Sequence, residues 1–195
     1  MSLVHTIGHS SHSQETFTGL LLGHGIEVVV DTRSLPYSKY TPQFDRESVQ
    51  KALAQSSIKY LFLGKELGGR PKSEDYYDAA GKVLYGKLTG DPLFLKGIGR
   101  LERGISQFRV ALMCSEEDPA NCHRRLLVGR VLTERGHVLL HIRADGHTED
   151  ESSIEKSSKK PLIAKQPALF AELEQDQWKS TASVSPKKAP ASSST

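Results

Sequence analysis

Short runs of branched apolar residues alternate with amphipathic segments over residues 3–142. The amphipathic segments repeat their apolar residues at helical spacing, whereas the runs are short and bounded by glycine or charged residues, as buried strands are. This alternation predicts an α/β fold with a mainly parallel five-stranded sheet, right-handed crossovers and three α/β/α layers. The predicted strands are 3–7, 26–30, 58–63, 108–113 and 137–142.

Helix signals separate these strands. Ser11 is the expected N-cap of a helix that closes near Gly25. Another helix is predicted over 45–57, and residues 74–106 are expected to be mainly helical. The last helix is predicted over 119–135, because Pro119 suits a first helical position, where its missing N–H costs nothing.

The pattern changes near residue 148. Residues 149–195 are rich in serine, proline and lysine and poor in branched apolar residues. Such a segment buries too little apolar surface to offset the entropy lost on ordering, so it is predicted to be a disordered tail. One amphipathic island stands out at 166–178, "QPALFAELEQDQW". The expected division is an α/β domain over 1–148 and a low-complexity tail over 149–195.

Composition narrows the class of protein. Hydrophobic residues make up 37%, and no apolar run is long enough to cross a membrane, so no membrane partner is expected. The N-terminus lacks the pattern of a secretory signal, and there are two cysteines. We therefore expect reduced thiols and an intracellular, cytoplasmic protein, or a nuclear one in a eukaryote. The net charge of +3 is too small to attract nucleic acid without a local basic cluster.

Reactive residue types follow the predicted strands. Ligands of open parallel sheets bind outside the carboxyl ends of the strands, so these residues are expected to share one rim. Asp31 is a candidate general base and Arg33 a candidate phosphate ligand, unless the two form a local ion pair. His9 is a candidate for acid–base work or else a hydrogen-bonded turn histidine. The candidate rim residues are His9, Ser10, Asp31, Arg33, Ser38, Glu66, Cys114 and Glu116.

The block "CSEEDPANCHR" at 114–124 holds both cysteines. A metal site is disfavoured, because the cysteine spacing is unfamiliar and because Cys122 and His123, as neighbours on a helix, would point about 100° apart. An anion site at the start of the helix fits better, with Arg124 gripping a phosphate or carboxylate. Cys114 ends a strand on the rim and is a candidate nucleophile, whereas Cys122 is expected to face the sheet.

Five segments in this order resemble the domain-of-unknown-function 488 family: "TIGHS" (6–10), "DTRSLPYS" (31–38), "YLFLGKELGGRP" (60–71), "LMCSEEDPANCHRRLL" (112–127) and "HIRADG" (141–146). The family pattern has valine at Thr32 and often alanine at Ser115, and neither difference removes a reactive group. The resemblance implies the motif residues His9, Asp31, Arg33, Glu66, Cys114, Glu116, Cys122, His123 and Arg124. It implies no established activity, although some members are labelled as DNA-repair-like.

The tail carries a second resemblance. Bacterial relatives often end in a Gln-x-x-Leu-Phe sequence that is similar to sliding-clamp-binding peptides, and "QPALF" has this form. The resemblance implies partner-binding roles for Gln166, Leu169 and Phe170. The alternative is a solubilising tail whose apolar residues dock on the domain.

These observations favour a Rossmann-like enzyme acting on a phosphate-bearing substrate, either a small nucleotide or nucleic acid. Acid–base or nucleophilic roles are expected for His9, Asp31, Cys114, Glu116 and His123. Substrate and anion contacts are expected from Ser10, Arg33, Ser38, Glu66 and Arg124. No metal and no cofactor are expected, and the class, hydrolase or transferase, stays open. The alternatives are a non-catalytic nucleic-acid or clamp-binding module and a thiol redox sensor.

Overall fold

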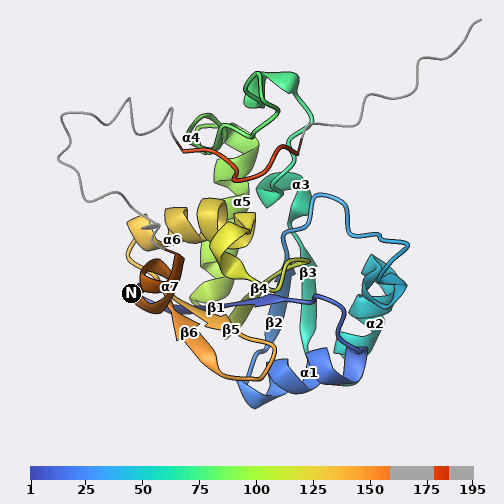
Figure 1. The fold of residues 1–195 in the computed structure, drawn as a ribbon. Coiled ribbons are helices and arrows are strands. Elements are labelled where there is room, and N and C mark those ends of the chain that lie inside the picture. The colour runs from blue at the N-terminus through green and yellow to red at the C-terminus, as the bar shows by residue number, and fades with distance from the viewer. Residues whose placement is uncertain (159–177, 185–195) are drawn as a thin grey trace, which may run out of the picture.

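The computed structural model describes residues 1–158 and 178–184. Its centre is a six-stranded sheet with the order β3-β2-β4-β1-β5-β6 (Figure 1). The first five strands are parallel, and β6 is antiparallel to β5. This confirms the predicted α/β class and the mainly parallel sheet, with one further edge strand. The strands are β1 (Leu3–Gly8), β2 (Val28–Asp31), β3 (Lys59–Phe62), β4 (Val110–Cys114), β5 (Val138–Ile142) and β6 (Thr148–Asp150).

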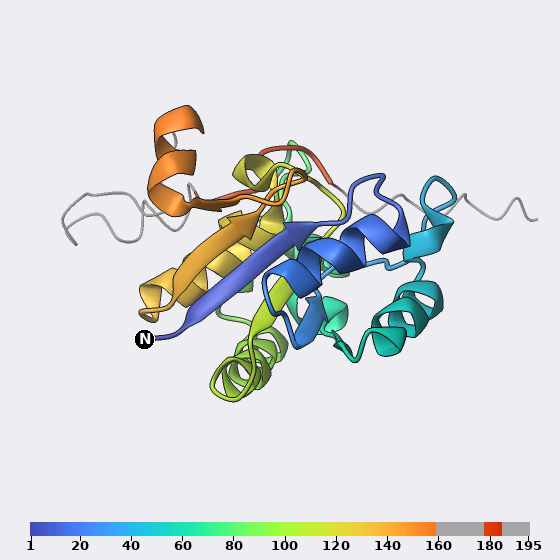
Figure 2. The ribbon, with the colours of Figure 1, turned by 90° about the horizontal axis from the view of Figure 1, so that it is seen from below.

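Helices cover both faces of the sheet. Helices α1 and α2 pack on the face that presents Val29, Ala111 and Met113, and α5 and α6 belong to the core on the other face. Figure 2 shows α2 and α7 at opposite edges of the molecule. The helices are α1 (Gln14–Gly23), α2 (Arg46–Gln55), α3 (Gly64–Leu67), α4 (Tyr85–Leu88), α5 (Pro92–Ile105), α6 (Arg130–Glu134) and α7 (Glu151–Ser158).

Capping side chains set where two of these helices begin. Ser13, not Ser11, caps α1, because its hydroxyl accepts the amide of Thr16. Asp91 caps α5 by accepting two backbone amides, directly before Pro92 at the first helical position. Asx-type and Ser caps of this kind satisfy amides that have no partner inside the helix.

The segment predicted as one helix over 119–135 is broken. Pro119–Asn121 forms a single 3-10 turn, which Asp118 caps through the amide of Ala120. Cys122 then has extended backbone angles, φ −96° and ψ 140°. A π-helical stretch, Arg124–Gly129, follows and leads into α6. The sulfur of Cys122 accepts the amide of Arg124 at 3.4 Å, so it takes the place of a cap at this restart.

Packed structure continues beyond residue 148, the expected end of the domain. Ile154 of α7 is 2% exposed, and Glu151 pairs with the buried Arg125. Residues 178–184 also lie against the domain, where the indole N–H of Trp178 donates to the Leu126 carbonyl at 2.7 Å. Composition missed these segments, because their packed apolar residues, Ile154, Trp178 and Val184, stand singly among polar ones.

The predicted partner-binding residues of the tail cannot be compared with the structure. Gln166, Leu169 and Phe170 lie outside the described residues, as does all of the island 166–178 except Trp178. Within 1–158 and 178–184, no helix combines the length and the apolar character that a membrane span needs.

Candidate functional site

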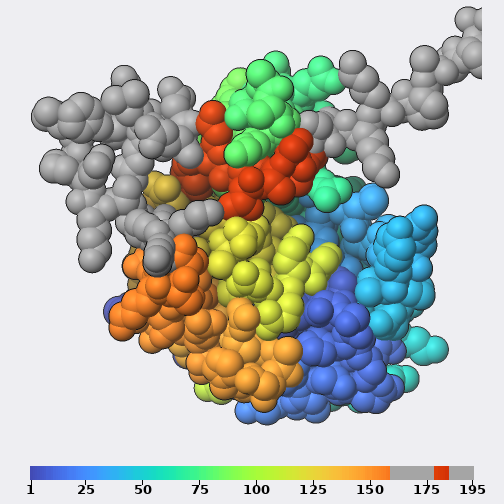
Figure 3. Space-filling view, viewed as in Figure 1, coloured from blue at the N-terminus to red at the C-terminus, as the bar shows by residue number. Residues whose placement is uncertain are grey.

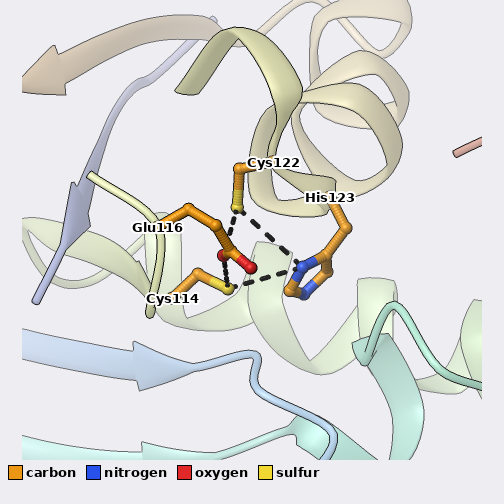
Figure 4. Close-up of side chains that lie close together, drawn as sticks. All are labelled: Cys114, Glu116, Cys122 and His123. Atoms are coloured by element: carbon orange, nitrogen blue, oxygen red, sulfur yellow. Dashed lines mark hydrogen bonds between the residues drawn. The ribbon is translucent and has the colours of Figure 1, made fainter. Parts of the chain in front are cut away.

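Four side chains converge at the carboxyl end of β4. The sulfurs of Cys114 and Cys122, a carboxylate oxygen of Glu116 and the Nδ1 atom of His123 all lie within 4.8 Å of one another (Figure 4). Glu116 Oε2 accepts from both thiols, at 2.8 Å from Cys114 Sγ and 3.1 Å from Cys122 Sγ. His123 Nδ1 lies 3.4 Å from Cys114 Sγ and 3.9 Å from Cys122 Sγ. We call these four residues the Cys–His–Glu cluster.

The break in the helix brings the last two members together. The expectation that Cys122 and His123 diverge by about 100° assumed that both belong to one helix. That assumption is wrong, because Cys122 has extended backbone angles and lies before the restart of the helix. The geometric argument against a shared ligand therefore does not hold in this structure.

The ring of His123 is fixed from two sides. Its Nε2 atom lies 2.9 Å from the Thr32 carbonyl oxygen, so Nε2 carries the hydrogen and Nδ1 presents a lone pair to the two sulfurs. On its other side the ring packs against the backbone of Gly69, where a Cβ atom would lie 2.7 Å from His123 Cγ. The cluster therefore holds a preset imidazole acceptor.

The cluster is strongly polarised. Partial desolvation of the Glu116 carboxyl would raise its pKa, but hydrogen bonds from both thiols and the nearby His123 lower it to about 2. Burial likewise opposes ionisation of Cys122, yet the hydrogen bond from Cys114, the charge of Arg124 and the neighbouring ring of His123 lower its pKa. Burial and the neighbouring negative charges raise the pKa of Cys114. These shifts make Cys122, and not Cys114, the thiol that loses its proton more readily; once it does, its hydrogen bond to Glu116 is lost.

A cavity of about 480 Å³ opens above the cluster. Cys114, Glu116 and His123 line it, together with two more of the predicted residues, Arg33 and Ser38. Its far wall comes from the C-terminal segment 178–184, drawn in red across the molecule in Figure 3. The other lining residues are Ser34, Leu35, Tyr37, Gly69, Arg70, Tyr85, Ser115, Asn121, Ser180, Thr181, Ala182 and Val184.

Asp31, Arg33 and His9 form a buried network beside the cavity. Arg33 pairs with Asp31 through two hydrogen bonds, of 3.0 and 2.7 Å, and Asp31 is fully buried. Arg33 Nη1 lies 3.1 Å from His9 Nε2. Burial first, and then the charge of Arg33, lower the pKa of His9 to about 4, so His9 is neutral at pH 7 and accepts this bond. The pairing of Asp31 and Arg33 is the local ion pair considered as the alternative role.

Arg124 does not lie where the sequence placed it. Its side chain is fully buried, and it does not line the cavity. The guanidinium donates to the Glu116 and Glu117 carbonyls and to the Thr6 hydroxyl. The expected convergence of Arg33 and Arg124 on one anion is therefore wrong, because the donors of Arg124 bind the protein's own backbone.

Two other predicted residues also lie away from the cluster. Glu66 lines a second cavity of about 400 Å³ and pairs with Arg100 at 2.5 Å. Ser10 lines neither of these cavities. It has a positive φ of 47°, and its amide donates to the Ser115 carbonyl.

The structure adds a basic residue that the sequence reading passed over. Arg70 is exposed and lines both cavities, and its amide donates to Ser34 Oγ at 2.9 Å. Its position directly after Gly68-Gly69, behind the third strand, was the available signal.

A sequence model described as "Domain of unknown function DUF488" matches residues 13–131, more than half of the chain. The chain belongs to the DUF488 family. Within this DUF488 chain the matched region contains the whole Cys–His–Glu cluster, but neither β1, β5, β6 nor segment 178–184. Searches among curated proteins and among solved structures found no match.

Proposed function

We propose that the chain is an enzyme acting on a phosphate-bearing substrate, a nucleotide or a nucleic-acid end, held in the 480 Å³ cavity. One observation carries the proposal: the polarised Cys–His–Glu cluster forms the floor of a cavity whose walls carry a free basic side chain and several hydroxyl groups. Ligand sites in proteins combine such a volume, roughly 300–1,000 Å³, with a few convergent polar groups.

The walls suit an anionic, hydroxyl-rich ligand. No hydrogen bond or ion pair engages the guanidinium of Arg70 among the described residues, so Arg70 can grip a phosphate with two parallel N–H bonds. Ser34, Ser38 and Thr181 add hydroxyls around the same space. Arg70 thus takes the anion-binding role expected of Arg124.

The floor supplies groups that can move protons or attack. His123 is held with Nδ1 toward the cluster, and Glu116 combines a carboxylate in contact with both sulfurs with an exposed position on the cavity. Groups whose pKa values are pushed in opposite directions at one site are typical of catalytic centres. A hydrolase or transferase is the class that such groups serve.

Calorimetric titration of the full chain with inorganic phosphate and with nucleoside monophosphates tests the proposal. Arg70→Ala should weaken binding about 10- to 150-fold, the equivalent of roughly 1.5–3 kcal/mol for a charged hydrogen-bonding group. Arg70→Lys should retain part of the affinity. Arg103→Ala, which removes an exposed arginine of α5 outside the cavity, is the matched control.

Binding of none of these ligands, or equal binding by the Arg70→Ala and Arg103→Ala variants, would contradict a phosphate site at this cavity. Turnover is then sought with the ligand that binds best. It should fall in His123→Gln while binding through Arg70 persists.

A further inference from the structure

We propose that Cys114, Glu116, Cys122 and His123 bind one Zn²⁺ ion at the floor of the cavity. This goes beyond the proposed function, because a bound ion would take up the His123 Nδ1 lone pair and both sulfurs and leave the Glu116 position as the one that exchanges. Metal binding is also measured without any substrate. Two sulfurs, one imidazole nitrogen and one carboxylate oxygen are a donor set that zinc takes in proteins.

The distances between donors match a tetrahedral ion. With zinc about 2.3 Å from sulfur and about 2.0 Å from nitrogen or oxygen, neighbouring ligand atoms of a tetrahedron lie roughly 3.5 Å apart. The four separations between a sulfur and either Glu116 Oε2 or His123 Nδ1 are 2.8, 3.1, 3.4 and 3.9 Å, and the other two, sulfur to sulfur and oxygen to nitrogen, are at most 4.8 Å. An ion fits once the Glu116 carboxylate oxygen moves away from the sulfurs, by up to about 0.7 Å from Cys114 Sγ.

The surroundings orient the donors as the outer shell of a metal site does. Metal-binding histidines commonly donate their second ring N–H to a carbonyl, and His123 Nε2 does this to Thr32. The amide of Arg124 donates to Cys122 Sγ, which holds this sulfur in place. Hydrogen bonds of this kind fix a ligand before the metal arrives, so the ordering cost of binding is small.

The loop that carries Glu116 is fixed as well. The buried guanidinium of Arg124 donates to the carbonyls of Glu116 and Glu117. Gly8 of β1 packs so closely that a Cβ there would lie 1.9 Å from the Glu116 carbonyl oxygen. The positive charge of Arg124 also offsets the negative charge that two thiolates and a carboxylate bring to one ion.

The site is open on one side. Both cysteines are buried, whereas Glu116 is an exposed residue that lines the cavity. Cys114 and His123 also border the cavity, so Glu116 is the most exposed of three donors that face it. Catalytic zinc sites keep three protein ligands and leave the fourth position to water or substrate, whereas structural sites are closed by four protein ligands. The fourth position can therefore pass from the Glu116 carboxylate to a water molecule or to an oxygen of the substrate.

The first test is the metal content of the full chain, prepared without an added histidine tag or chelator. We expect elemental analysis by inductively coupled plasma mass spectrometry to find one zinc ion per chain. After removal of the metal, Co²⁺ should bind with the intense visible bands of tetrahedral coordination and with a sulfur-to-cobalt charge-transfer band, and Zn²⁺ should displace it.

Variants identify the ligands. Cys114→Ser, Cys122→Ser and His123→Gln should each weaken Zn²⁺ binding by more than the roughly 10- to 100-fold that the loss of an outer-shell partner costs. Glu116→Gln should alter the cobalt spectrum, whereas the neighbouring Glu117→Gln should not. The His147→Gln control removes an exposed histidine that is outside the cluster and should bind normally.

If a serine variant does not fold, alkylation of the native chain decides instead: added Zn²⁺ should protect both thiols together. Three results would each overturn the assignment. The metal-free chain could fail to show a Co²⁺ spectrum, or the cysteine variants could bind Zn²⁺ as tightly as the unsubstituted chain. The native chain could also hold a Cys114–Cys122 disulfide that prevents metal binding. If the zinc site fails one of these tests but the metal-free chain still binds phosphate, the proposed function remains supported without the zinc site.

Discussion

His5 should make the protein lose stability as the pH falls from 7.5 to 4.5. This histidine of β1 is 4% exposed, and its Nδ1 atom has no hydrogen-bond partner among the described residues. Burial first, and then the nearby His24 and Arg109, lower its pKa from 6.5 to about 4. As the pH falls, His5 therefore becomes protonated near pH 6.5 in the unfolded chain but only near pH 4 in the folded chain.

The size of the effect follows from this difference. At pH 4.5 the side chain is almost fully protonated in the unfolded state and mostly neutral in the folded state, which costs the folded state about 2–3 kcal/mol. At pH 7.5 the cost is close to zero. Since the folded-state pKa is the lower one, stability is present above pH 6.5 and is lost below it.

Urea denaturation at the two pH values measures this loss. In His5→Leu the drop in unfolding free energy should be smaller by about 2–3 kcal/mol than in the unsubstituted chain. The His147→Leu control, at a side chain that is 59% exposed, should keep the full drop. An equal drop in His5→Leu would show that water or a rearranged neighbour already solvates this imidazole. His9, with its pKa lowered to about 4 by burial and Arg33, should contribute to the remaining drop.

Two further substitutions test the site and its support. Gly69→Ala places a methyl group 2.7 Å from His123 Cγ, so the imidazole ring must move. Zinc affinity, measured by competition with a chelator, should then fall about 10- to 100-fold. An unchanged affinity would mean that Gly69 does not hold the ring in place. Asp31→Ala leaves Arg33 buried without its carboxylate and should cost about 3–5 kcal/mol in urea denaturation; a cost below 1 kcal/mol would show that the pair is solvated.

The parallel strands could be predicted from the sequence because their signal is local. Runs such as 26–30 and 108–113 are branched and apolar, and the observed strands β2 and β4 lie within two residues of the predicted limits. Strand β6 carries no such signal, since Thr148–Asp150 is polar and pairs at the edge of the sheet. Residues 178–184 carry no strand or helix pattern either, since backbone hydrogen bonds, such as the one from Ser180 to the Val83 carbonyl, and the two separate apolar residues Trp178 and Val184 attach them.

The site was only partly predictable. The position of Cys114 and Glu116 on the rim follows from the end of β4, and the structure places both at the cavity. The convergence of Cys122 with His123 depends on the extended backbone angles of Cys122. Hydrophobic periodicity cannot predict this convergence, because it does not report the dihedral angles of a single residue. The buried role of Arg124 was hidden as well, because a guanidinium can serve backbone carbonyls as readily as a bound anion.

Because segment 178–184 forms one wall of the cavity, the residues that would select a substrate are separate in sequence from the residues of the Cys–His–Glu cluster. The reactive side chains all come from 114–123, whereas Ser180, Thr181, Ala182 and Val184 supply a wall outside the region matched to the family. A chain cut after residue 158 would present the same reactive floor in an open trough. Exchanging this short stretch between relatives is therefore a direct route to altered substrate selectivity with the chemical centre intact.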